Sequence, residues 1–235
     1  GIVISGVPDP TPNDTVLISA GDGGMTLTNT GGMGGAVTTI FIGYQFVGRT
    51  VFPTLDLLAD NVTIQGGDGG DGKTGSKAGL VSKVDVRIAT PDAAGDELMI
   101  LGGVGGDNLL ATGGKSGVGG SLQKIAARNQ ILSPGAGVLL QAGDGGLASG
   151  GALGAAGGSI TDAALLATNQ KVFAGNGSAG KRGGHGGSLK NVTVESAAGV
   201  LPRNAAFNAG FGGAGAAGNG GNGGLITNLI VSDSD

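Results

Sequence analysis

Glycine recurs at every third position in several stretches of this chain, and this spacing limits the conformations open to it. The clearest stretch has Gly212, Gly215, Gly218, Gly221 and Gly224. Three residues per turn is the period of the polyproline-II helix, so these glycines would lie along one edge of such a helix. Because glycine lacks a Cβ, that edge lets another backbone approach closely. The spacing predicts ordered polyproline-II or polyglycine-II arms, whereas the alternative of flexible linkers explains only the glycine content.

The glycine arms belong to a repeat that aligns about six times along the chain. Each copy begins with a short apolar run that leads into Gly-x-Gly, as residues 62–64 lead into Gly67. After each arm comes the pattern apolar-x-x-apolar-x-apolar, as in Val81, Val84 and Val86. Its alternating end and its β-branched residues predict a strand. We therefore expect an all-β fold, a repetitive β-solenoid-like stack of short strands with glycine-rich polyproline-II or polyglycine-II arms.

The repeat also predicts how the chain is organised. We expect a single repeat domain over residues 1–235, with copies at approximately 15–60, 61–97, 98–137, 138–170, 171–204 and 205–235. The first copy carries an insertion that holds Tyr44, Phe46 and Phe52. Ile2 and Ile4 resemble the tail of a further copy, so we expect the chain to be part of a longer chain or assembly. A repeat that cannot bury its apolar edge alone favours self-association.

Composition and charge argue against several functional classes. The chain has 55 Gly, no Cys, 13 Lys+Arg and a net charge of −4. A chain without Cys cannot form a disulfide framework or a Cys-based zinc site. A chain without a basic run is a poor partner for nucleic acid, and short apolar runs do not insert into a membrane. No spacing of Ser, His and Asp indicates a catalytic set, so we expect neither an enzyme nor a bound organic cofactor.

Two local motifs point to ligands, and both are weak in a chain so rich in glycine. Residues 67–74 satisfy the phosphate-loop pattern, but the sequence after them predicts a strand instead of the helix that the motif requires. Residues 102–109 match one calcium-binding nonapeptide of the secreted repeat-in-toxin type. The candidate calcium ligands are Asp22, Asp68, Asp107 and Asp144.

The alignment offers a second interpretation of these aspartates. The arm position of Asp22 and Asp68 is occupied by Val104 and Phe211 in other copies, which a row of metal ligands would not tolerate. Asp and Asn are also common turn residues, so a backbone-bonding role is the simpler hypothesis. Calcium is kept as the alternative, and no other cofactor is expected.

Short Val/Ile strands combined with Gly-Asp-Gly-Gly and Gly-Gly-x-Gly-Gly-Ser blocks resemble the giant glycine-rich repeat proteins of bacterial surfaces, which include haemagglutinin-like and autotransporter-like β-solenoids. The period-three glycines are similar to the polyglycine-II domains of some phage tail-fibre adhesins and of a glycine-rich antifreeze protein. The first resemblance implies export to an extracellular or cell-surface location. It also implies a structural role as a filament, surface-layer or stalk module that acts by rigidity and self-association. The alternative is an adhesin that recognises carbohydrate or a surface protein through Tyr44, Phe46 and Phe52.

Overall fold

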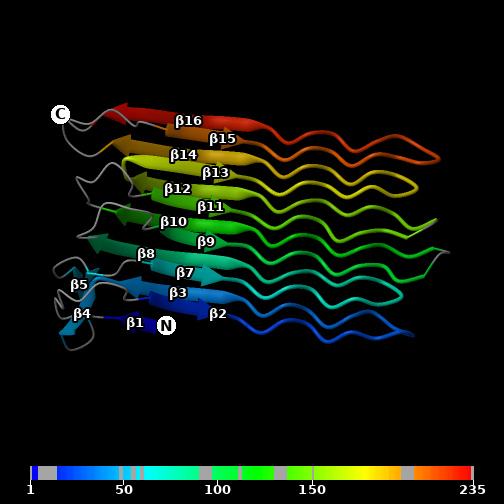
Figure 1. Ribbon diagram of the computed structural model, residues 1–235, viewed down its shortest axis with the longest axis horizontal. Coiled ribbons are helices and arrows are strands. Elements are labelled where there is room, and N and C mark those ends of the chain that lie inside the picture. Colours follow the sequence, from blue (N-terminus) through cyan, green and yellow to red (C-terminus); the bar gives the residue numbers. More distant parts are fainter. Residues whose placement is uncertain are drawn as a thin grey trace.

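The computed structural model describes residues 2–4, 15–47, 50–53, 57–58, 61–89, 97–110, 113–129, 137–149, 151–196 and 204–233. Within these residues the chain has no helix, and its strands form two parallel sheets and one antiparallel hairpin (Figure 1). The predicted all-β class is therefore confirmed. Two sheets of parallel strands stacked along one axis are the arrangement expected of a β-solenoid-like protein.

Each sheet collects one type of strand from the repeat. Sheet A contains the strands that follow the arms, together with two short strands: β1 (Ile2–Ile4), β3 (Val37–Ile42), β6 (Leu57–Leu58), β8 (Val81–Ala89), β10 (Leu122–Asn129), β12 (Ile160–Leu166), β14 (Leu189–Ser196) and β16 (Ile226–Asp233). Sheet B contains the strands that precede the arms: β2 (Thr15–Ser19), β7 (Asn61–Gln65), β9 (Glu97–Leu101), β11 (Gly137–Gln141), β13 (Asn169–Phe173) and β15 (Asn204–Asn208). The hairpin consists of β4 (Tyr44–Val47) and β5 (Thr50–Pro53) in the insertion of the first copy.

One strand of sheet B, one arm and the next strand of sheet A make a coil, and successive coils stack in chain order (Figure 1). The strand pairing keeps equivalent residues beside each other, so that Ile64 pairs with Ile100 in sheet B and Val84 pairs with Ile125 in sheet A. β1 pairs in parallel with β3, with Ile2 beside Ile40.

The core lies between the two sheets and is built from their inward-facing side chains. The apolar positions predicted from the repeat fill it, and Ile64, Ile100, Leu140 and Val192 are all buried there. β16 is an edge strand of sheet A and pairs with β14 among the described residues. There Ile226 and Val231 are 44% and 51% exposed, although the equivalent Leu189 and Val194 in the coil below are fully buried.

Every coil of sheet A contains a bend at the same repeat position. The bend residue has a left-handed backbone with φ between 54° and 60°, and the six residues are Thr39, Lys83, Lys124, Asp162, Asn191 and Asn228. This conformation is uncommon for residues other than glycine, although Asn and Asp tolerate it best. The bend explains the two polar residues between the first and second buried positions of the pattern, because it puts two successive side chains outside the core.

The glycine arms continue the two sheets as two layers that meet at the arm tips (Figure 1). In each coil an outgoing limb leaves sheet B and a returning limb enters sheet A. The outgoing limbs are residues 20–29, 66–73, 102–110, 142–149, 174–181 and 209–217. The returning limbs are residues 30–36, 74–80, 114–121, 153–159, 182–188 and 219–225.

Backbone hydrogen bonds join the two layers in a zigzag that we call the inner ladder. Gly143 N–H donates to Gly120 O at 2.9 Å, Gly158 N–H donates to Gly143 O at 2.8 Å, and Gly175 N–H donates to Gly158 O at 2.9 Å. The same pattern continues through Gly187 and Gly210 to the last coil. Because successive ladder residues lie in turn on an outgoing and a returning limb, the ladder joins every coil to the next.

A single triplet shows how the limbs use their remaining amides. Gly67 N–H donates to Gly35 O in the other layer at 2.9 Å, and Gly69 N–H donates to Val104 O in the next coil at 2.8 Å. The amide between them, Asp68 N–H, donates to the side chain of Asp22 in the preceding coil at 2.8 Å. Three successive amides therefore point in three directions. A Cβ at Gly67 would clash with the Gly21 carbonyl oxygen and a Cβ at Gly69 with the Ser76 carbonyl oxygen, so the two positions that face other limbs require glycine.

Candidate functional site

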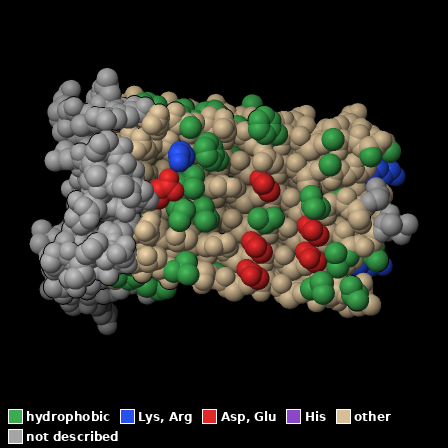
Figure 2. Space-filling model, in the orientation of Figure 1, with side chains coloured by type: hydrophobic (Ala, Val, Ile, Leu, Met, Phe, Trp, Pro, Cys, Tyr) green, Lys and Arg blue, Asp and Glu red, His purple; other side chains and the backbone are tan. Residues whose placement is uncertain are grey.

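The outward positions of the outgoing limbs form two rows across the coils. The first row is Asp22, Asp68, Val104, Asp144, Asn176 and Phe211, and the second is Met25, Asp71, Asp107, Leu147, Ala179 and Ala214. Figure 2 shows acidic side chains gathered in two columns near the middle of this face, with hydrophobic side chains between them. We call the face made by the outgoing limbs and the outer side of sheet B the acidic face.

The aspartates of both rows accept hydrogen bonds from the backbone of the next coil. Asp68 Oδ1 accepts from Val104 N–H at 2.7 Å, and Asp144 Oδ1 accepts from Asn176 N–H at 2.6 Å. In the second row Asp107 Oδ1 accepts from Leu147 N–H at 2.7 Å. Each carboxylate thus accepts a hydrogen bond from an outward-pointing amide of the next coil, for which neither arm layer supplies a backbone acceptor. The same rule extends to Asn176, whose Oδ1 accepts from Phe211 N–H at 2.9 Å.

The four candidate calcium ligands therefore lie on one face but not in one site. Asp22, Asp68 and Asp144 share the first row, where Val104 separates Asp68 from Asp144, and Asp107 stands in the second row. Among the described residues, no three His, Cys, Asp or Glu side chains form a group suited to a metal ion. The hydrogen bonds give these carboxylates a structural role that requires no metal, and calcium binding stays a prediction.

This role leads to a matched pair of variants. Replacing Asp68 with alanine should lower the free energy of unfolding by about 1 kcal/mol, because Val104 N–H loses its acceptor. Replacing Asp68 with asparagine should leave it nearly unchanged, because an amide oxygen fills the same role at Asn176. Urea unfolding of both variants measures the difference. Equal losses in the two variants would show that the charge of Asp68 matters rather than its acceptor.

The returning limbs use other side chains for the same purpose. Ser121 Oγ accepts from Ser159 N–H at 3.1 Å, and Ser159 Oγ accepts in turn from Ser188 N–H at 3.0 Å. His185 Nδ1 accepts from Asn222 N–H at 3.0 Å, so the single histidine supports the backbone. The sequence held a signal for this row, since Ser recurs before the first apolar position of three successive copies.

The outer side of sheet A is hollowed along the stacking direction. Ala126 lies in the same row as Phe41 and Asp85, and its small side chain leaves space there. A shallow groove of about 380 Å³ results, and its rim includes Lys83, Lys124 and Asp162. We call the face made by the returning limbs and the outer side of sheet A the basic face, because cations predominate among its charged residues.

Tyr44 packs against Phe41, which lines this groove. Its side chain is 7% exposed, its ring packs edge-on against Phe41, and the Arg87 guanidinium lies 5.4 Å from the ring centre. Burial raises the pKa of Tyr44, the nearby Asp85 carboxylate raises it further, and Arg87 opposes both effects. Tyr44 is thus largely buried and contact between it and carbohydrate stays a prediction, while the side chains of Phe46 and Phe52 lie outside the described part of the structure.

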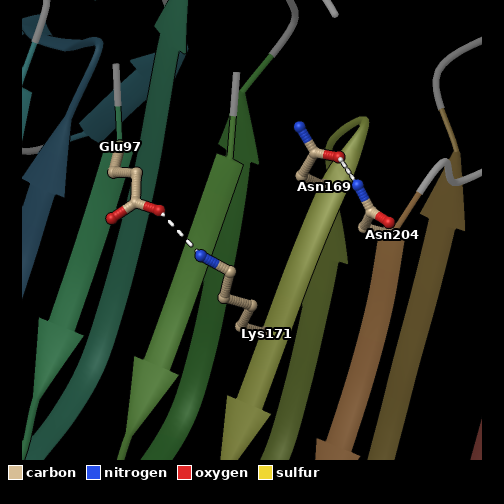
Figure 3. Close-up of polar contacts among 4 residues, drawn as sticks. All are labelled: Glu97, Asn169, Lys171 and Asn204. Atoms are coloured by element: carbon tan, nitrogen blue, oxygen red, sulfur yellow. Dashed lines mark hydrogen bonds and ion pairs between the residues drawn. The ribbon is translucent and has the colours of Figure 1, made fainter. Parts of the chain in front are cut away.

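On the outer side of sheet B, polar side chains pair across the strands (Figure 3). Lys171 Nζ lies 3.3 Å from Glu97 Oε1 and reaches it across β11, where Gly137 offers no side chain in between. Asn204 Nδ2 donates to Asn169 Oδ1 at 3.5 Å on the neighbouring strands. These exposed contacts stabilise the sheet by at most about 1 kcal/mol each.

The motifs that suggested small ligands fall within the arms. Residues 67–74 belong to an outgoing limb and its turn, and the residues after them form a returning limb and β8. The helix that a phosphate loop needs is absent from this segment, as the sequence predicted.

Comparisons with known proteins identify no relative. No family model, no curated protein and no solved structure matches this chain. Within the described residues no helix has the length and apolar character needed to cross a membrane.

Proposed function

We propose that this chain is a structural protein of an extracellular or cell-surface assembly, such as a filament, surface layer or stalk, and that it works by rigidity and self-association. The observation that carries the proposal is the inner ladder, which binds both arm layers and all coils into one hydrogen-bonded body. We interpret the arms as polyglycine-II segments, which can project beyond the sheets because backbone hydrogen bonds to neighbouring limbs hold them. The resemblance to glycine-rich surface proteins supports the location outside the cell.

The side-chain chemistry on the two faces favours this role over catalysis. On the outgoing limbs the aspartates accept backbone amides, and on the returning limbs Ser121, Ser159 and His185 do the same. A group that is committed to holding the backbone is a poor general base, because its lone pair and its position are already used. These polar groups of the arms thus act as hydrogen-bond acceptors that join one coil to the next.

Pulling a single molecule from its two ends tests the rigidity. If each coil is a separate hydrogen-bonded layer, the coils should detach one after another. A coil of about 35 residues should release about 12 nm of chain per step, since an extended residue spans roughly 3.5 Å. A smooth extension at low force, without steps, would rule out the rigid module.

A further inference from the structure

The two broad faces of the molecule carry opposite charge. On the acidic face the described charged residues are Asp22, Asp68, Asp71, Glu97, Asp107 and Asp144, opposed by Lys171 and by Lys73 and Lys181 near the arm tips. On the basic face they are Lys77, Lys83, Arg87, Lys115, Lys124, Arg128, Arg182 and Lys190, opposed by Asp85, Asp162 and Glu195. The net charge of −4 for the whole chain conceals this separation.

We infer that a second copy of this chain docks face to face on the first, with the acidic face of one copy against the basic face of the next. This inference rests on the proposed structural function and names the surfaces through which the copies would associate. Opposite potentials on two surfaces of one molecule favour pairing unlike faces, since like faces repel each other. Because the two surfaces differ, the contact is heterologous and continues from copy to copy instead of closing into a dimer.

The positions of the charges support a stack of copies in which each copy is related to the next by translation. Gly79 N–H donates to Gly67 O and Ser76 N–H donates to Gly70 O, so Asp68 and Lys77 lie at the same level of the arm on opposite faces. Gly117 N–H donates to Gly106 O, which places Asp107 opposite Lys115 in the same way. A copy translated perpendicular to the arm layers would therefore bring an acidic row over a basic row.

Apolar side chains add contact area between the charges. Met25, Leu147 and Phe211 are 68%, 69% and 74% exposed on the acidic face. Met33 and Leu225 are 72% and 68% exposed on the basic face. Exposed apolar side chains that alternate with charges are typical of protein interaction surfaces.

The area of each face is sufficient for a specific contact. Coils about 4.8 Å apart give the six-coil stack a height of roughly 25 Å, and strand plus arm measure roughly 45 Å in length. Each face thus offers about 1,000 Å², compared with the ~800 Å² per partner that a standard interface buries. Contacts that depend on charge should weaken as salt rises, because the screening length falls to about 8 Å at physiological ionic strength.

Two variants, each of which removes charges from one face, test the inference. In the first, Asp68, Asp71, Asp107 and Asp144 are changed to asparagine, which removes most of the negative charge of the acidic face but keeps an oxygen for the next coil. In the second, Lys77, Lys115 and Arg182, all exposed, are changed to glutamine. Sedimentation velocity at low salt compares each variant with the unmodified chain, and amide exchange confirms that the arms stay folded.

The unmodified chain should associate at low salt and dissociate as salt is added. Each variant alone should lose association by about tenfold or more, since the limbs of one of its faces have lost most of their charge. A mixture of both variants should form one-to-one dimers, because the first keeps a basic face and the second keeps an acidic face.

Three results would overturn the inference. The first is association that is as strong in either variant as in the unmodified chain, the second is a mixture that stays monomeric, and the third is binding of the basic face to an acidic polysaccharide without self-association. Stepwise unfolding under force together with any of these results would support the rigid module and reject only the docking of the acidic face on the basic face.

Discussion

The largest loss of stability is expected when a glycine of the inner ladder gains a side chain. Replacing Gly143 with alanine should lower the free energy of unfolding by about 3 kcal/mol or more. A Cβ at this position would fall far inside the van der Waals distance of the Gly103 carbonyl, and that oxygen belongs to the backbone and cannot turn aside. The limbs must separate, which adds overpacking strain to the weakening of the bonds that join Gly143 to Gly120 and Gly158.

A matched control lies in the first coil. Gly24 belongs to an outgoing limb as well, but a Cβ there would meet nothing within 4 Å. Replacing Gly24 with alanine should leave the urea midpoint unchanged or raise it slightly, since alanine restricts the unfolded chain. If the Gly143 and Gly24 variants unfolded at the same urea concentration, the close approach of the two arm layers would be refuted.

The second large effect is expected in the core between the sheets. Ile100 is fully buried in the middle of sheet B, where it pairs with Ile64 on one side and with Leu140 on the other. Replacing Ile100 with alanine should cost about 2–5 kcal/mol, because it removes buried methyl groups and leaves a cavity that parallel neighbours cannot close.

Thermal unfolding measures this loss, and Leu17 provides the comparison. Leu17 lies in β2 of the same sheet but is 66% exposed, so its replacement with alanine should change stability by less than about 0.5 kcal/mol. A small effect at Ile100 would mean that the arms, and not the sheets, hold the molecule together.

The strands were predictable because their signal is local. Apolar alternation and β-branched residues predicted both strand types, and the repeat predicted that equivalent residues such as Val84 and Ile125 would pair. The left-handed bend at Lys83 and Lys124 was not predicted, since lysine has no preference for positive φ. Only Asp162, Asn191 and Asn228 at this position carried a signal, because these residue types tolerate that conformation.

The role of the arm aspartates was only partly predictable. The alignment already argued against a row of metal ligands, because Val104 and Phe211 interrupt it. The hydrogen bond from Val104 N–H to Asp68 joins residues 36 positions apart, so it depends on how the coils stack. The separation of charge between the two faces depends in the same way on which limb lies on which side, and no sequence window contains that information.

Hydrogen exchange of the arm amides, measured with and without calcium, tests the central claim most directly. The ladder amides of Gly143, Gly158 and Gly175 should exchange as slowly as those of the core strands in the absence of calcium. The amide of Asp144 should exchange faster, because the preceding residue of its row, Val104, offers no acceptor. Fast exchange of all the arm amides, or protection that requires calcium, would contradict a body held together by its own glycine backbone.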